Sequence, residues 1–164
     1  MIRRGGSLQV SLCLSLLIAA VAVCPTAVSA TTLTWNVAGG DWFAPGSWSP
    51  AQVPDNGDAV VISSGAVLLT NSTANLASLA ISGGTLTFSN WVTTLSATNL
   101  SITGTGVVTH AGPYTTSQMS NRVAISCGVL NIDAGARIDA NGMGFAGGAV
   151  SVVGYGPGAS SGDG

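Results

Sequence analysis

The chain has 164 residues, carries a formal net charge of −2, and contains only 6% charged residues. Beyond residue 30 it has no lysine and no glutamate, and its two arginines and six aspartates give that part a net charge of −4. Nucleic acids and anionic lipid surfaces are bound through clustered cations, so the composition excludes both as partners.

Residues 1–30 have the features of a secretory signal peptide. Arg3 and Arg4 precede an apolar run, residues 10–23, and small residues follow at 28–30. The run is shorter than the roughly 20 residues of a membrane-spanning helix, so we expect cleavage and no membrane insertion of the mature chain. A secreted or cell-surface location follows. Only Cys127 then remains of the three cysteines, and we interpret it as a small buried hydrophobe.

Residues 31–58 contain three of the four tryptophans, Trp35, Trp42 and Trp48, in a segment interrupted by glycine and proline. The open end of a repetitive β structure recruits further strands unless it is covered, and large aromatic side chains can cover it. We therefore predict that this segment is an N-terminal cap. The alternative hypothesis is that the three indoles are exposed and bind sugar rings.

Residues 59–145 contain a repeat. Apolar residues alternate with a period of two, which predicts β strands. Four ten-residue segments, beginning at Val60, Leu79, Leu100 and Val123, share one pattern of isoleucine, small residues and two later apolar positions. The alignment gives an isoleucine column of Ile62, Ile81, Ile102 and Ile125, an apolar column of Val67, Leu86, Val107 and Leu130, and a turn column of Gly65, Gly84, Thr105 and Gly128.

The spacings between copies are 19, 21 and 23 residues. At about 3.3 Å per residue, twenty residues give a path of about 65 Å, enough to go once around three short sheet faces. We therefore predict an all-β fold, a right-handed parallel β-helix of about four rungs, with isoleucines stacked inside and glycines at the bends. An antiparallel β-sandwich is the alternative, because LAIS-GG-TLTF also fits a hairpin.

The end of the chain is more ambiguous. A partial copy at residues 136–145 is either another face of the fourth turn or the start of a fifth. Residues 146–164 are glycine-rich, and we expect that the chain is truncated there. The spacing Gly142 to Gly147 matches a dinucleotide-binding fingerprint, but no helix can follow it in this sequence.

The densest charges are Asp133, Arg137 and Asp139, with Arg137 and Asp139 on the outer face by alternation. β-Helix polysaccharide lyases and hydrolases place acids and an arginine on such a face, which makes these three residues a weak catalytic alternative. Paired-carboxylate chemistry needs two acids converging at about 5 to 10 Å, so we interpret them as solvated charges. His110 has no second ligand at metal-binding spacing. We expect no catalytic residue, metal or cofactor.

The sequence contains the pattern TW, GGDW, SW, VP and NGDAVVI, followed by the isoleucine and glycine rungs. This pattern resembles the start of bacterial secreted parallel β-helix proteins. These are autotransporter-type passengers and surface repeat adhesins. The resemblance covers residues 32–145 and implies an exported, adhesin-like stalk. We predict a structural or adhesive β-solenoid without catalytic activity of its own, whose partners are extracellular polysaccharide or other surface proteins. The alternatives are the N-terminal part of a carbohydrate-active β-helix enzyme and a sugar-binding module.

Overall fold

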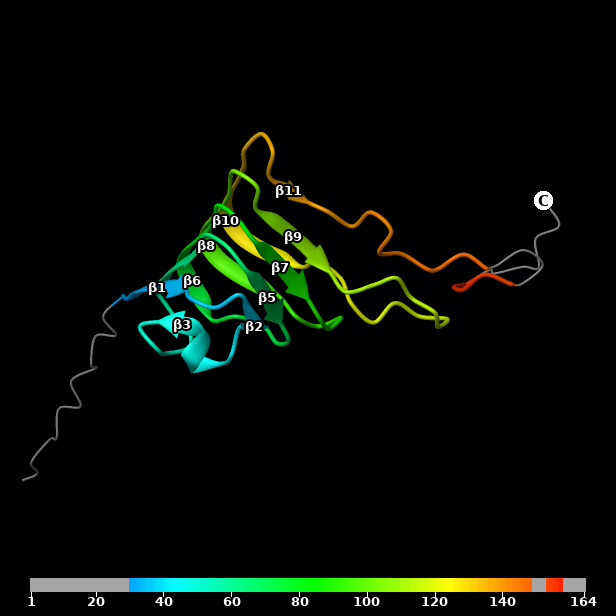
Figure 1. The fold of residues 1–164 in the computed structure, drawn as a ribbon, viewed down its shortest axis with the longest axis horizontal. Helices are drawn as coiled ribbons and strands as arrows, with labels where there is room; N and C mark the ends of the chain where they lie inside the picture. The colour runs from blue at the N-terminus through cyan, green and yellow to red at the C-terminus, as the bar shows by residue number, and fades with distance from the viewer. Residues whose placement is uncertain (1–29, 149–152, 158–164) are drawn as a thin grey trace, which may run out of the picture.

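The computed structural model describes residues 30–148 and 153–157, so all but the last residue of the predicted signal peptide lies outside the described residues. The described chain forms two β sheets and no α-helix, which confirms the predicted all-β class (Figure 1). The larger sheet contains, in spatial order, β3 (Trp48–Ser49), β1 (Thr32–Trp35), β4 (Ala59–Ile62), β6 (Asn75–Ile81), β8 (Leu95–Ile102) and β10 (Ile125–Ile132). The smaller sheet contains β2 (Gly39–Asp41), β5 (Ala66–Leu69), β7 (Thr85–Phe88), β9 (Val107–His110) and β11 (Arg137–Ile138).

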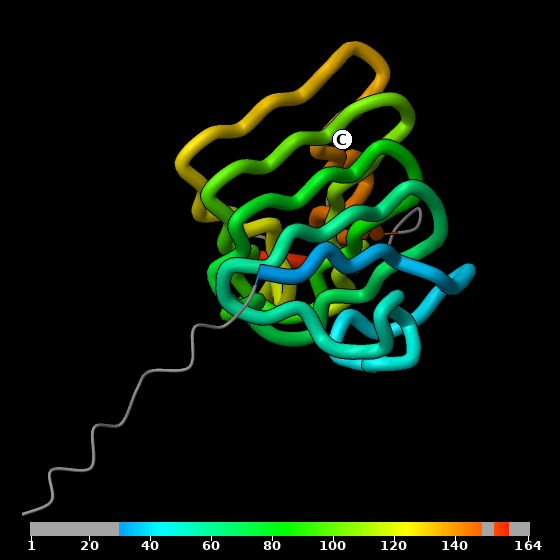
Figure 2. The backbone as a smooth tube through the Cα atoms, turned by 90° about the vertical axis from the view of Figure 1, so that its left-hand side faces the viewer, coloured from blue at the N-terminus to red at the C-terminus, as the bar shows by residue number. Residues whose placement is uncertain are grey.

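From β4 onward the chain alternates between the two sheets, and from β5 onward each strand pairs in parallel with the preceding strand of its own sheet. Successive passes of the backbone lie one above another in Figure 2. Among the described strands only β1 and β3 pair antiparallel. The predicted cap segment also contributes β1 and β2, which pair with β4 and β5, so it supplies one strand of the parallel series to each sheet.

The aliphatic columns form the core between the sheets. Ile62 pairs with Ile81, Ile81 pairs with Ile102, and all three are fully buried. Val67 pairs with Leu86 in the smaller sheet, and both are buried as well. The first three members of the predicted isoleucine column are therefore confirmed.

The fourth member of that column was predicted wrongly. Ile132 pairs with Ile102, whereas Ile125 pairs with Leu95, and Leu130 lies above Leu100. The reason is that β10 is eight residues long and both of its halves carry apolar residues two apart. VAIS (residues 123–126) and LNID (residues 130–133) therefore fit the same template, and only packing against β8 distinguishes them.

A second prediction was also wrong: the position of the third copy in the apolar column. Its turn is one residue longer, so Val108, rather than Val107, pairs with Leu86 and is buried. Thr105 and Gly128 likewise do not occupy the turn column. The turns instead carry glycines with positive φ in two stacked pairs: Gly84 lies against Gly65, and Gly135 lies against Gly104. The partial copy at 136–145 contains β11, which pairs with β9 and so belongs to the fourth pass.

The tryptophans of the cap segment cover one edge of the larger sheet. Trp35 and Trp42 each pack edge to face against Trp48, with both pairs of ring centroids 4.9 Å apart. Trp48 donates a 2.7 Å hydrogen bond from Nε1 to the carbonyl of Trp42. Because β3 pairs with β1 and places Trp48 opposite Trp35, the segment occupies the outer side of β1.

Polar side chains continue the ladder through the loops. Oγ of Ser72 accepts a 3.0 Å hydrogen bond from the N–H of Thr94, and Oγ1 of Thr73 accepts one of 2.9 Å from the N–H of Ser96. These bonds join successive passes just before β6 and at the start of β8. They explain why the connections are rich in serine, threonine and asparagine.

The glycine column provides a stability test. A Cβ at Gly84, where φ is +76°, would overlap the carbonyl oxygen of Gly65, so Gly84→Ala adds a steric clash to backbone strain. Gly57 has φ of +81° with open space around it, and Gly46 has open space without a positive φ. We expect urea unfolding to show a loss of about 3 kcal/mol or more for Gly84→Ala, about 1–2 kcal/mol for Gly57→Ala and about zero for Gly46→Ala. Equal losses for the first two variants would contradict the close stacking of successive turns.

Candidate binding cleft

A cleft of 560 Å³ opens beside the sheets. Three segments distant in sequence line it: the loop after β7, the insertion after β9 and the segment after β11. Its lining residues are Trp91, Ser117, Gln118, Met119, Phe145 and Pro157.

The insertion after β9 and the segment after β11 run beside each other and project away from the sheets (Figure 1). We call them the arm, which comprises residues 111–121, 141–148 and 153–157. Tyr114 forms a parallel bridge with Phe145, donates its N–H to the carbonyl of Gly144 at 2.9 Å, and accepts the N–H of Ala146 at 2.8 Å. Backbone pairing therefore holds the two halves of the arm together.

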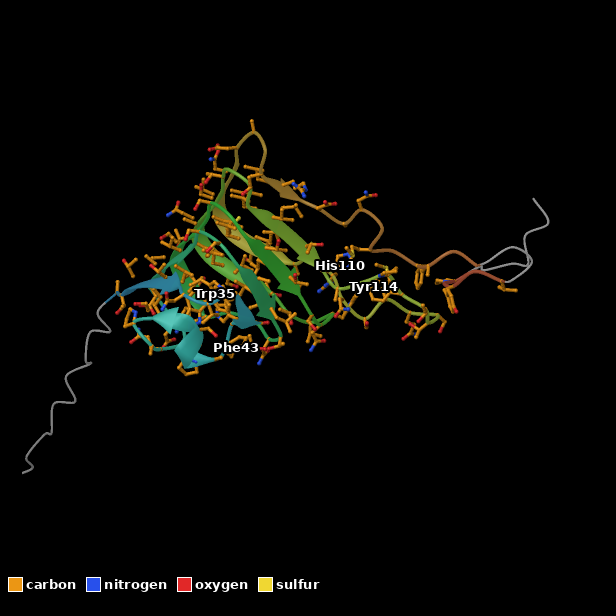
Figure 3. The ribbon with its side chains drawn as sticks, in the orientation of Figure 1. Trp35, Phe43, His110 and Tyr114 are labelled. Carbon is orange, nitrogen blue, oxygen red and sulfur yellow. The ribbon has the colours of Figure 1, made fainter. Side chains whose placement is uncertain are left out.

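A buried polar cluster anchors the arm to the sheets. The Tyr114 hydroxyl lies 2.8 Å from the carbonyl oxygens of Ala111 and Asn121 and accepts the Asn121 N–H at 3.1 Å. Nδ1 of His110 lies 3.1 Å from the same hydroxyl, and the two rings are stacked at the base of the arm (Figure 3). His110 also lies in register with the buried Phe88, so its ring occupies the end of a core column.

Trp91 differs from the other three tryptophans, because 43% of its surface is exposed while theirs is buried. The Arg122 guanidinium carbon lies 4.9 Å from the centre of the Trp91 ring, and Nε donates a 2.8 Å hydrogen bond to the Trp91 carbonyl. A cation over an indole and a charge-assisted hydrogen bond together restrict the loop. The cleft wall is therefore held in place before any ligand arrives.

The burial of Trp35, Trp42 and Trp48 overturns the hypothesis that these three indoles form an exposed sugar-binding surface. They pack edge to face at the first edge of the larger sheet and leave no exposed ring face for a sugar. Sequence reasoning selected them because they cluster. It overlooked Trp91, although an isolated tryptophan in the polar stretch SNWVTT, outside any apolar alternation, is itself a signal of an exposed aromatic side chain.

The three charged residues singled out from the sequence do not form one cluster of bonded groups. Arg137 and Asp139 form an exposed ion pair with a 3.0 Å Nε to Oδ2 distance, whereas Asp133 accepts a hydrogen bond from Asn131. The pKa of Asp139 lies below its usual value. The largest cause is the hydrogen bond that its carboxylate accepts from the Asn141 N–H, and the second is the hydrogen bond from Arg137. A general acid needs a raised pKa, so the shift is in the direction opposite to that chemistry.

Comparison with known families gives one match: the G8 domain model matches residues 47–160. The chain belongs to the G8 domain family. The G8 domain is an extracellular domain, and neither an autotransporter nor an adhesin family is shown. No curated protein and no solved structure matches the chain.

The match places the G8 domain over the repeat, the arm and all the residues that line the cleft. Within the described residues of this G8 domain no helix is long and apolar enough to cross a membrane. The same residues contain no group of three or more histidine, cysteine or acidic side chains arranged to hold a metal ion.

The chemistry of the G8 domain cleft follows from its lining. Trp91, Met119, Phe145 and Pro157 provide apolar surface, and Ser117 and Gln118 provide a hydroxyl and an amide. None of the described residues lining the cleft is charged. Such a site matches a neutral ligand with one flat apolar face and hydrogen-bonding groups at its rim.

The Tyr114 hydroxyl should be required for anchoring the arm. Tyr114→Phe removes the hydroxyl that donates its one hydrogen to the carbonyl of either Ala111 or Asn121 in a buried site, so we expect the free energy of unfolding to fall by about 1–3 kcal/mol. Hydrogen exchange at the Asn121 amide should accelerate, because its acceptor is removed. Tyr155→Phe, at an exposed tyrosine, is the matched control. An Asn121 amide that exchanges equally slowly in both variants would contradict the anchoring role.

Proposed function

We propose that this G8 domain is a secreted or cell-surface structural and adhesive module, without catalytic activity of its own, that attaches to a neutral extracellular glycan through the cleft. The single observation that carries the proposal is the exposed Trp91 ring, held by Arg122 in the wall of an uncharged cleft. An exposed, restrained indole pays little conformational entropy on binding, which favours its use as a binding surface.

We also propose that the two sheets are successive faces of a right-handed parallel β-helix. The alternation of the chain between the sheets supports this architecture, as does the register that continues from β1 to β10 and from β2 to β11. The right hand follows from the strong preference for right-handed connections between parallel strands of one sheet. A β-helix would give the module the elongated shape of a stalk, with the cleft on its side.

A glycan fits the cleft better than an acidic or basic ligand does. The apolar face of a sugar ring packs against an indole, and its hydroxyl groups need partners such as those of Ser117 and Gln118. A volume of 560 Å³ lies within the range of about 300–1,000 Å³ of small-molecule sites. None of the described lining residues is charged, and the nearby Arg122 is engaged by the ring and the carbonyl of Trp91, which favours a neutral sugar over a uronic acid.

Two observations favour binding over the alternative of a carbohydrate-active enzyme. The described acids do not line the cleft, and the pKa of Asp139 is lowered by its neighbours. The proposal therefore assigns to Asp133, Arg137 and Asp139 a role in solvation of the outer face.

Tryptophan fluorescence during titration with neutral and acidic oligosaccharides tests the proposed function. We expect a neutral oligosaccharide to change the emission of the native chain, because Trp91 is its exposed tryptophan. Trp91→Ala should weaken binding at least tenfold, measured by calorimetry, which corresponds to about 1.4 kcal/mol.

Val92→Ala is the matched control, because Val92 is the neighbouring exposed residue and does not line the cleft. It should bind as the native chain does. A panel of neutral glycans that leaves the emission unchanged, or equal affinity for Trp91→Ala and Val92→Ala, would refute the glycan site.

A further inference from the structure

β10 is the outer strand of the larger sheet at the end opposite the tryptophans. It pairs with β8 on one side, and no described residue pairs with its other side (Figure 2). The exposed fractions of its side chains reach 58% at Val129 and 45% at Leu130. The first edge of this sheet is covered by β3, so the two ends of the same sheet differ.

Natural proteins protect such an edge with charges, proline or a bulge. β10 has the sequence ISCGVLNI, which contains no charged residue and no proline. β10 is also eight residues long, whereas many exposed edges are protected because the edge strand is very short. Neither charge nor proline therefore blocks the pairing of β10 with another strand.

The inward side chains of β10 follow from its register on β8. In β8 the buried residues are Leu95, Ala97, Leu100 and Ile102. The residues of β10 paired with them are Ile125, Cys127, Leu130 and Ile132. The alternation therefore changes phase once, at Gly128 and Val129 in the middle of the strand.

This change of phase makes the inward pattern of β10 read the same in both directions. Inward residues occupy the first, third, sixth and eighth positions, which are symmetric about the midpoint between Gly128 and Val129. Directly opposed residues of an antiparallel pair lie on the same face of the sheet. A twofold axis at that midpoint therefore matches all eight positions, and a shift of one residue in either direction opposes inward residues to outward ones.

We propose that β10 is a self-association edge, at which a second copy of this chain pairs antiparallel about that twofold axis. Ile125 then lies opposite Ile132 of the second copy, Cys127 opposite Leu130, and Gly128 opposite Val129. The interiors of the two copies become continuous, because a twofold axis normal to the sheet keeps both inner faces on one side.

Charge is compatible with this register. The aspartate nearest to β10 is Asp133, directly after its last residue. The proposed pairing places Asp133 of one copy beside Ala124 of the other, so the two Asp133 carboxylates stay at opposite ends of the paired segment. The contact comprises one strand pair and the end of one core, which is small for a stable interface, so we expect a dimer with a dissociation constant in the micromolar range or weaker.

Sedimentation of the purified chain from about 1 to 500 µM tests the proposal. We expect a concentration-dependent shift from monomer to dimer. Val129→Lys places a charge at the centre of the pairing and should weaken the dimer at least tenfold. Val92→Lys, at a residue whose exposed fraction is 69% and which lies outside β10, should not. A native chain that stays monomeric to 500 µM would overturn the proposal.

Oxidative cross-linking tests the register independently. Cys127 is a free thiol, and in the proposed register it faces Leu130 of the second copy. Leu130→Cys should therefore form a covalent dimer on mild oxidation through two Cys127 to position 130 bonds, whereas the native chain should not. Positions 127 and 130 of one strand are about 10 Å apart, too far for a bond within one copy. Cross-linking of the native chain, or none in Leu130→Cys, would overturn the register.

Discussion

The stacking of aliphatic side chains in register, one parallel strand above the next, is the interaction on which the rest of the structure depends. No single pass of the chain can bury its own apolar face, so each strand completes the core of the strand before it. Ile81 lies between Ile62 and Ile102, and all three are fully buried. Ile132, at the end of the column, has the same position and remains exposed on one side.

This constraint does not fix the connections between the strands. The candidate binding cleft is formed by these connections. The short connections continue the ladder through serine and threonine side chains and stay within the stack. The insertion after β9 leaves the stack, and it can do so because His110 and Tyr114 close the core beneath it. The arm and the loop of Trp91 then form a cleft at a fixed place beside the sheets. Rigid sheets thus position a variable site, as is common for binding surfaces on loops.

Much of this arrangement could be predicted from the sequence, and the failures have physical causes. The first three copies share an isoleucine at a constant place, and stacking requires that match. In the fourth copy, Ile125 and Ile132 fit the template equally well, so only contacts with β8 decide between them. β2, with the sequence GGD, has no side-chain pattern of a strand and exists because it pairs with β5. The buried tryptophans were selected because they cluster in the sequence, whereas the exposed Trp91 is isolated in the sequence.

Methyl NMR of isoleucine-labelled protein tests the stacking most directly, because all six isoleucines beyond residue 30 lie in β4, β6, β8, β10 and β11. Parallel stacking in this register predicts nuclear Overhauser contacts from Ile62 to Ile81, from Ile81 to Ile102 and from Ile102 to Ile132. Contacts from Ile102 to Ile125 in place of Ile132, or backbone contacts typical of antiparallel strands between β6 and β8, would contradict it.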